Sequence, residues 1–299
     1  VWPQAMTSSA LGSMRETWES AAGIVAQSPL ISLLAGTLVW IVINRVAAIF
    51  LGSIATWKRR QNLDELASCV PSILHCSLVT VLAYEELRSR GWGVSSAPTF
   101  ALNALQGGAG DGQREFEMLA SNTPTGTAVL IYCSSYMLAD LWFLFTFSPS
   151  VLYIAHHVAT LIYMLSSLYL QLSDLSVCLC IFLGEMTNPI NNMYCISDLL
   201  NHEGWVHRRV NWVFASSLAA GFVVVRLLYC PFGLCVVIVE TLFFRPQASA
   251  IPFLLRCVWA VLVVGSTATS ALFLKGLLSD VFSGNTTRRS KEELTKQEA

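Results

Sequence analysis

The chain contains seven long runs of apolar residues, and this feature limits its fold more than any other. A helix needs about 20 such residues to cross the hydrocarbon core of a bilayer, where only helices and closed barrels satisfy their backbone groups. We therefore predict an all-α, multi-pass transmembrane helical bundle of about seven spans. The runs cover residues 30–57, 66–84, 127–147, 151–172, 175–197, 210–244 and 251–272.

The composition agrees with an integral membrane protein and excludes one broad class of function. Of 299 residues, 54% are hydrophobic and only 12% are charged, which is typical of membrane chains. The 18 basic and 19 acidic residues nearly balance, so no broad basic surface is available for phosphates and no nucleic-acid partner is expected. The nine cysteines lie mostly in apolar runs and indicate no disulfide framework.

The connections between the runs divide the chain into three parts. We expect an N-terminal segment with the first span at 1–65, a membrane domain at 66–275 and a charged, disordered tail at 276–299. The connection at 86–126 is rich in glycine, serine and charge and predicts a flexible loop. The run at 210–244 is too long for one straight span, and Pro231 is expected to kink or break it.

The distribution of basic residues predicts the orientation of the bundle. Lys and Arg are enriched in cytoplasmic connections. With seven spans, the side richer in these residues holds the connections near 58–60 and 208–209 and the C-terminal tail. We therefore predict a cytosolic C-terminus.

Polar side chains within the runs are the candidates for a functional site, because such groups are costly in lipid. On the fifth run Glu185, Asn188 and Asn192 recur at helical spacing and share one face. Pro189 cannot donate a hydrogen bond to the carbonyl of Glu185 and leaves it free. The other polar residues of the runs include Asn44, Arg45, His75, Asp140, His156, His157, Asn191 and Arg226.

The adjacent pair His156 and His157 occupies the fourth run. Neighbouring helical residues point about 100° apart, so one ring can face Glu185 while the other turns toward the third or sixth run. A neutral imidazole can act as a base or nucleophile in acyl transfer. Either Glu185 or Asp140 would then hold the tautomer and stabilise the imidazolium.

Each of these residues also has a purely structural interpretation. The histidine pair can serve as buried hydrogen-bonding residues, Asp140 and Arg226 can form an ion pair within the bundle, and His75 can be a packing residue. A metal site is not expected, because the chain has only five histidines, lacks an HExxH motif and offers an adjacent pair, which is a poor start for tetrahedral ligation. No cofactor is predicted.

Several short motifs, in this order and spacing, resemble the TLC domain family over roughly residues 66–272. His75 fits the histidine of an early helix of that domain. The remaining motifs are Tyr136-Met137-Leu138-Ala139-Asp140, His156-His157 with Thr160, Gly184-Glu185-Met186-Thr187-Asn188-Pro189-Ile190-Asn191-Asn192, and Val225-Arg226 followed by Pro231.

This resemblance implies a protein of the endoplasmic reticulum that acts on membrane lipids. The family includes ceramide synthases, which join an acyl-CoA to a sphingoid base at a site containing the histidine pair and an HDxxD-type stretch. Here residues 184–188 read Gly-Glu-Met-Thr-Asn, so the full ceramide synthase motif is missing. The chain is more similar to small TLC-domain proteins linked to membrane lipid composition. Substrate contacts are then expected from His75, Tyr136, Asn188, Asn192 and Arg226.

Three functions follow from these patterns. The first is lipid binding, regulation of membrane lipid composition or lipid metabolism through a polar site around the histidine pair. The alternative is an acyl-CoA-dependent acyltransferase in which His156, His157, Glu185 and Asp140 are catalytic. A proton-coupled transporter rests only on the ionisable groups within the spans.

Overall fold

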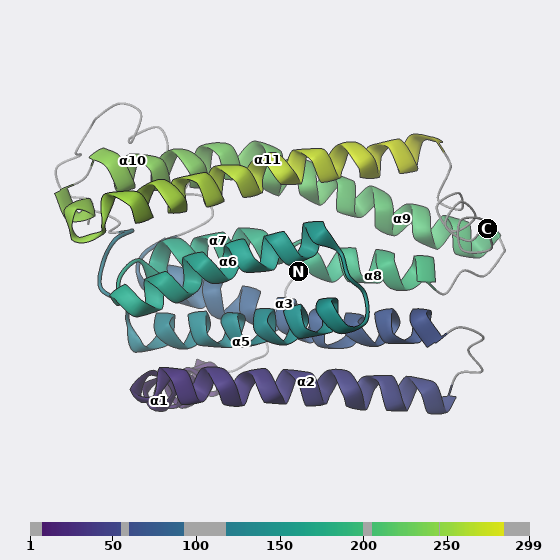
Figure 1. Cartoon of the computed structure of the whole chain (residues 1–299), viewed down its shortest axis with the longest axis horizontal. Helices are drawn as coiled ribbons and strands as arrows, with labels where there is room; N and C mark the ends of the chain where they lie inside the picture. The colour runs from purple at the N-terminus through teal and green to yellow at the C-terminus, as the bar shows by residue number, and fades with distance from the viewer. Residues whose placement is uncertain (1–7, 55–59, 93–117, 200–204, 245, 284–299) are drawn as a thin grey trace.

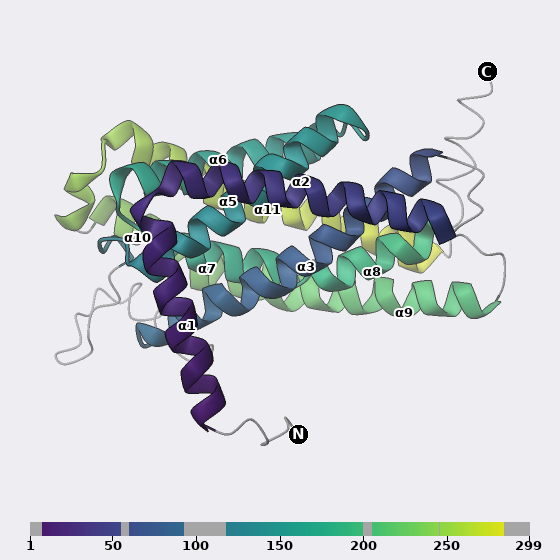
Figure 2. The ribbon, with the colours of Figure 1, turned by 90° about the horizontal axis from the view of Figure 1, so that it is seen from below.

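The computed structural model describes residues 8–54, 60–92, 118–199, 205–244 and 246–283. Within these ranges the chain is helical and has no strand, which confirms the predicted all-α bundle. Most helices run along one long direction, whereas α1 turns away from α2 (Figures 1 and 2). The elements are α1 Ser8–Gln27, α2 Pro29–Ile54, α3 Arg60–Ser89, α5 Pro124–Thr146, α6 Val151–Leu170, α7 Asp174–Glu185, α8 Asn188–Leu199, α9 Trp205–Gly221, the π-helix η1 Phe222–Cys235, α10 Val236–Phe244, the 3-10 helix η2 Pro246–Ala250 and α11 Phe253–Ser283.

Six helical segments are long and apolar enough to cross a bilayer, counting only the described residues. They are α2, α3, α5, α6, α9 continuing into η1, and α11. The predicted span at 175–197 is instead divided into the short helices α7 and α8, which follow one another alongside α3 (Figure 1). The bundle thus has six continuous spans and one interrupted segment, rather than seven continuous spans.

The interruption of this segment follows from Pro189. The proline offers no amide hydrogen to the carbonyl of Glu185, so the ladder of helical hydrogen bonds cannot continue past this residue. Helix α7 therefore ends at Glu185, and α8 begins at Asn188, where a proline in the first turn is tolerated. The two helices meet within the bundle, at the level of the polar residues.

The sixth predicted run remains helical through Pro231, so the expected break is wrong. Helix α9 continues directly into η1, which contains Pro231, and η1 continues into α10. A π-helix is wider than an α-helix and loosens the hydrogen-bond ladder, which gives a proline room without ending the helix. The same wide segment carries Arg226.

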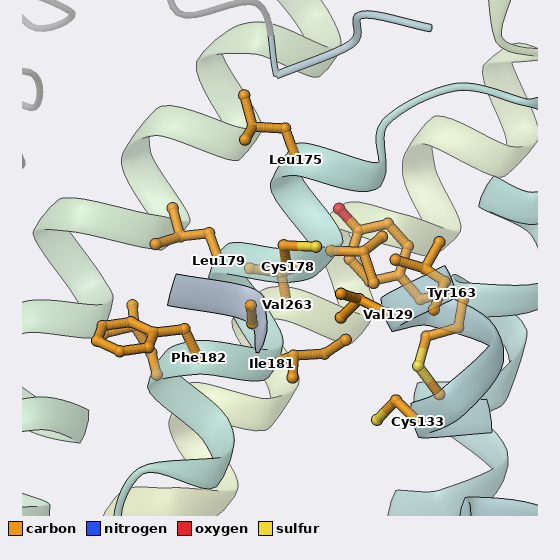
Figure 3. Packing of buried hydrophobic residues seen from close by; sticks show 14 of the residues in the cluster. Val129, Cys133, Tyr163, Leu175, Cys178, Leu179, Ile181, Phe182 and Val263 are labelled. Atoms are coloured by element: carbon orange, nitrogen blue, oxygen red, sulfur yellow. The ribbon is translucent and has the colours of Figure 1, made fainter. Parts of the chain in front are cut away.

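The core lies at the centre of the bundle and the outer helices present apolar surface. In the most apolar stretch of α5, 67% of the residues are buried inside the bundle, against 17% in that of α2. Side chains of α5 and α7, including Val129, Cys133, Leu179 and Phe182, pack together there (Figure 3). Apolar side chains on α2 and α11 that face outward suit contact with lipid tails.

Two predicted connections fall partly within helices. Helix α3 extends to Ser89 and α5 begins at Pro124, so residues 86–89 and 124–126 of the predicted loop are helical. Helix α11 continues to Ser283, so residues 276–283 of the predicted tail are helical as well. Residues 93–117 and 284–299 lie outside the described residues.

Candidate functional site

Both ring nitrogens of His157 on α6 are engaged. Nδ1 lies 2.8 Å from the carbonyl oxygen of Tyr153, and Nε2 lies 2.8 Å from Oδ2 of Asp140 on α5. A carbonyl only accepts hydrogen bonds, so Nδ1 donates. The contact between Nε2 and Asp140 needs one further proton. This proton lies either on Nε2, which makes the pair imidazolium and carboxylate, or on Oδ2, which makes it imidazole and carboxylic acid. His157 is also buried, with 6% of its surface exposed, and is therefore an anchored residue.

This contact shows which of the two candidate carboxylates pairs with the histidine pair. Either Glu185, the favoured partner, or Asp140 was expected to orient an imidazole, and the carboxylate that bonds His157 is Asp140. Glu185 remains within electrostatic range of His157. The reason is the position of α6 against α5, which places His157 beside Asp140 and leaves Glu185 to residues of its own segment.

His156 differs from its neighbour in exposure and in bonding. The two ring planes are 88° apart, with centroids 5.5 Å from each other. His156 is exposed, and no described residue forms a hydrogen bond with its ring. It lies within electrostatic range of Arg226 and Asp140. His156 thus has free hydrogen-bonding capacity beside charged groups, which is what acid-base chemistry or headgroup contact requires.

Glu185 lies in a chain of amide contacts across the α7–α8 junction. Its carboxylate accepts a 2.7 Å hydrogen bond from Nδ2 of Asn188. Nδ2 of Asn192 donates to the carbonyl oxygen of Asn188 at 2.9 Å and to Oγ of Ser72 on α3 at 2.9 Å. The structure therefore brings the predicted face together despite the helix interruption. Ser72 was missed, because a serine in an apolar run usually bonds its own helix.

Arg226 on η1 contacts the end of α7 rather than Asp140. Its Nη2 donates to the carbonyl oxygen of Gly184, and its guanidinium lies 5.4 Å from the ring centre of Phe222. Among the described residues, Asp140 and Arg226 therefore do not form the ion pair of the structural interpretation, because Asp140 bonds His157 instead. The carbonyl is available because the helix stops before Asn188 could bond it. The buried Nε of Arg226 has no hydrogen-bond partner in the described chain.

His75 lies inside a cluster of aromatic rings. It is 1% exposed and stacks on Tyr136, with ring centroids 3.9 Å apart and planes 8° apart. Trp40 and Tyr132 also contact the His75 ring. This arrangement fits the packing interpretation of His75. The substrate contacts predicted for His75 and Tyr136 remain predictions.

The chemistry available at this site is that of proton transfer and of hydrogen bonding to a polar headgroup. The described residues contain no group of three His, Cys, Asp or Glu side chains that could hold a metal ion. The site offers a free imidazole at His156, a guanidinium at Arg226 and a buried carboxylate at Glu185. All three lie where the surrounding spans are apolar.

Comparison with known proteins places this arrangement in a family. A model of the TLC domain family matches residues 65–274, which is more than half of the chain. The chain belongs to the TLC domain family. A TLC domain-containing protein of Arabidopsis thaliana is 28% identical over 234 residues, covering 76% of this chain and 81% of that protein. No solved structure matches the chain.

The TLC domain holds the whole candidate site. Residues 65–274 include His75, Asp140, both histidines of the pair, Glu185 and Arg226. Helices α1 and α2 and the first turn of α3 precede the domain. The family resemblance expected from the motifs is thereby confirmed, while the roles of the individual residues remain predictions.

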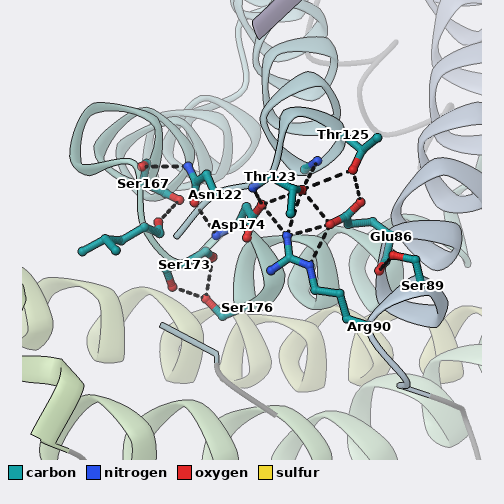
Figure 4. Close-up of polar contacts among 12 residues, drawn as sticks. Glu86, Ser89, Arg90, Asn122, Thr123, Thr125, Ser167, Ser173, Asp174 and Ser176 are labelled. Atoms are coloured by element: carbon teal, nitrogen blue, oxygen red, sulfur yellow. Dashed lines mark hydrogen bonds and ion pairs between the residues drawn. The ribbon is translucent and has the colours of Figure 1, made fainter. Parts of the chain in front are cut away.

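The TLC domain also contains a polar cluster that the sequence did not indicate (Figure 4). Arg90, just beyond α3, lies 2.6 Å from both Glu86 and Asp174. The backbone N–H of Thr123 donates to Asp174 at 2.7 Å, and the hydroxyl of Thr125 donates to Glu86 at 2.5 Å. We refer to Glu86, Arg90, Thr123, Thr125 and Asp174 as the end cluster.

The end cluster joins three segments at one end of the bundle: the end of α3, the start of α5 and the start of α7. Burial works against the charge of Arg90, but the bonds and charges of Asp174 and Glu86 raise the pKa of its guanidinium. The sequence offered a weak signal, namely charges at the ends of apolar runs. Such charges are more often solvated, so their pairing could not be foreseen.

Proposed function

We propose that this protein handles lipids within the membrane, by binding them, regulating membrane lipid composition or taking part in lipid metabolism, through the polar site around His156. The observation that carries this proposal is the exposed His156 ring, which bonds no described residue and lies within electrostatic range of Arg226 and Asp140. Polar groups in the spans of a bundle are costly and usually serve function. Membership of the TLC domain family supports a lipid as the ligand.

The contacts of each residue suggest whether it binds the lipid or positions another residue that does. His157 has both nitrogens bonded and is sealed against Asp140, so it holds α6 to α5 and fixes the direction of His156. Arg226 ties η1 to the end of α7 through Gly184 and keeps a donor for a polar headgroup. In this arrangement His156 contacts the lipid, while His157 and Asp140 are positioning residues.

A second candidate function is favoured by the same free imidazole. An acyl-CoA-dependent acyltransferase would use His156 to take the proton from a lipid amine or hydroxyl as this group attacks the thioester carbonyl. The new amide or ester bond forms, the bond between carbonyl carbon and sulfur breaks, and the proton passes to the leaving CoA thiolate. Attack by the imidazole itself on the thioester is the nucleophilic version of this step. A sphingoid base is one acceptor to test.

Lipid profiles from cells test the first proposal. Wild type, His156→Ala and Val158→Ala would be expressed in cells lacking the protein, and membrane lipids measured by mass spectrometry. Val158 is an exposed apolar neighbour on α6 and serves as the matched control. We expect wild type and Val158→Ala to change the same lipid species and His156→Ala to change none. Equal lipid profiles with and without wild-type protein would refute lipid handling.

An assay with microsomes decides between regulation and acyl transfer. Labelled acyl-CoA would be offered with a panel of sphingoid and lysophospholipid acceptors. Product formed by wild type and lost in His156→Ala would establish the acyltransferase. No product above background, together with the cellular lipid change, would leave lipid binding or regulation without chemistry.

We further propose residence in the endoplasmic reticulum with a cytosolic C-terminus. The basic connections near 58–60 and 208–209 support this orientation. An epitope added after Ala299 should be reached by antibody in cells whose plasma membrane alone is permeabilised. Staining only after all membranes are opened would reverse the orientation.

A further inference from the structure

Arg226 and Arg256 hold the ends of two helices in the same way. Nη2 of Arg226 donates to the carbonyl oxygen of Gly184, one residue before the end of α7. Nη1 of Arg256 donates to the carbonyl oxygen of Leu242, near the end of α10, at 3.3 Å. In both arginines the buried Nε bonds no described residue, and the guanidinium lies 5.4 Å and 5.3 Å, respectively, from the centre of a phenylalanine ring. The two arginines therefore share one structural role.

The surroundings of the two arginines differ. Arg226 lies near the middle of the continuous helical stretch 205–244, where a bilayer offers a charge no water. Arg256 is close to the start of α11, which lies together with α10 at one end of the bundle (Figure 1). His156, whose exposed ring forms no hydrogen bond with a described residue, is within electrostatic range of Arg226. Of the two arginines, Arg226 is thus the one beside a group with free hydrogen-bonding capacity.

The carboxylates of the candidate site already have donors. Oδ2 of Asp140 lies 2.8 Å from Nε2 of His157, and the carboxylate of Glu185 accepts a 2.7 Å hydrogen bond from Asn188. Among the described residues, neither carboxylate forms an ion pair with Arg226. An ammonium headgroup would have to compete with these donors, whereas a headgroup that accepts hydrogen bonds would meet the free imidazole and the guanidinium.

The charges of the candidate site can balance one added negative charge. His157 and Asp140 share one proton in their contact, so this pair is neutral as a whole. When Glu185 is ionised, its charge cancels that of Arg226, and a proton taken up by His156 balances a bound anion. When Glu185 is protonated, the charge of Arg226 itself is free to balance the anion. An anionic ligand is therefore compatible with either state of Glu185.

We propose that His156 and Arg226 bind the anionic group of a lipid, either the carboxylate of a fatty acid or the phosphate of a phospholipid. This inference rests on the proposed lipid function and specifies the class of lipid. Charged donors form their strongest hydrogen bonds with carboxylate and phosphate oxygens. Because the His156 ring is exposed on α6, a headgroup can reach it from the surface of the bundle. Leu152, four residues earlier on the same face, is exposed as well and suits contact with the lipid tail.

Binding of matched lipid pairs tests this class. The full chain, purified in a nonionic detergent, would be incubated with radiolabelled lipid at a pH where oleic acid is ionised, and the retained label counted. One pair is oleic acid and oleyl alcohol, and the other is phosphatidic acid and diacylglycerol with the same tails. We expect at least one anionic lipid to bind about tenfold or more tightly than its neutral partner. A preference in the first pair identifies a carboxylate ligand, and a preference in the second a phosphate.

Arg226→Gln and Arg256→Gln are the matched variants. Each loses a guanidinium that holds a helix end and gains an amide that can bond a carbonyl. We expect Arg226→Gln to lose the preference for the anionic lipid and Arg256→Gln to keep it. His156→Ala should reduce the preference by about threefold or more, and this variant keeps the test valid if Arg226→Gln fails to fold.

Equal binding of the anionic and the neutral lipid in both pairs would overturn the proposal. A preference that Arg226→Gln and Arg256→Gln change equally would overturn it as well. Labelled sphingosine, which carries an ammonium group, distinguishes this failure from failure of the proposed function. Tight binding of sphingosine that is lost in His156→Ala would show that the site handles lipids but selects cationic rather than anionic ones.

Discussion

The end cluster and the site around His156 are both polar regions of one apolar bundle, yet they differ in how many of their groups are bonded. In the end cluster, Arg90, Glu86, Thr123 and Asp174 bond one another across three segments. At the site, the His156 ring is exposed and forms no hydrogen bond with a described residue. A densely bonded network fixes the fold, whereas spare hydrogen-bonding capacity is available for a ligand.

The largest expected effect comes from breaking the end cluster. Asp174→Asn removes the carboxylate opposite Arg90 and leaves a buried charge with fewer partners, so we expect a loss of about 3 kcal/mol in the free energy of unfolding. Unfolding in detergent, followed by intrinsic fluorescence, measures this loss. Asp64→Asn is the control, because Asp64 lies 3.5 Å from Arg45 in a partly exposed pair and should cost under about 1 kcal/mol. Equal losses in the two variants would contradict the role of the end cluster.

A smaller effect is expected from Gly126→Ala, which crowds the same region without removing a charge. A Cβ at this position would lie 2.0 Å from Oδ2 of Asp174, so either the carboxylate or α5 must shift. We expect a loss of about 1 to 3 kcal/mol in the free energy of unfolding. Gly265→Ala on α11 meets nothing within 4 Å and should not destabilise the protein. Wild-type stability of Gly126→Ala would show that the contact with Asp174 is not close.

Asp140→Asn tests the anchored half of the histidine pair. The amide keeps the shape but weakens the bond to Nε2 of His157, so we expect a loss of about 1 kcal/mol in unfolding free energy. Thr160→Ala is the comparison, because Thr160 bonds only a carbonyl of its own helix. If Asp140→Asn were as stable as Thr160→Ala, the contact between His157 and Asp140 would not hold α6 to α5.

The smallest effect on stability is expected from His156→Ala. Its ring is exposed and forms no hydrogen bond with a described residue, so the free energy of unfolding should change by less than about 0.5 kcal/mol. The same unfolding experiment measures this change. A loss as large as that of Asp174→Asn would show that His156 is part of the fold, and the distinction between the two regions would fail.

Much of the fold could be predicted because the hydrocarbon core of a bilayer requires each spanning helix to be apolar over its whole length. Each continuous span needs an uninterrupted apolar run, and the runs matched the six long segments. The interruption at Pro189 was not foreseen, because a proline within a span can kink a helix, end it or be absorbed in a wide turn. Pro231 shows the third outcome, since η1 continues through it.

For the candidate site, the sequence indicated which residues to consider but not how they pair. Polar residues within apolar runs identified His156, His157, Asp140 and Glu185, but helical spacing does not say which helix faces which. The pairing of His157 with Asp140 depends on how α6 packs against α5. The end cluster was missed because Arg90 and Asp174 are 84 residues apart in the chain, and neither lies in a motif.

The most direct test compares the lipid effect of His156→Ala with that of Asp174→Asn, each divided by the amount of folded protein in the membrane. Folded protein is measured by fluorescence size-exclusion chromatography, and the lipids by mass spectrometry of the same membranes. We predict that Asp174→Asn lowers the folded amount but keeps the wild-type lipid effect per folded molecule, whereas His156→Ala folds normally and loses that effect. A full lipid effect in folded His156→Ala would contradict the account.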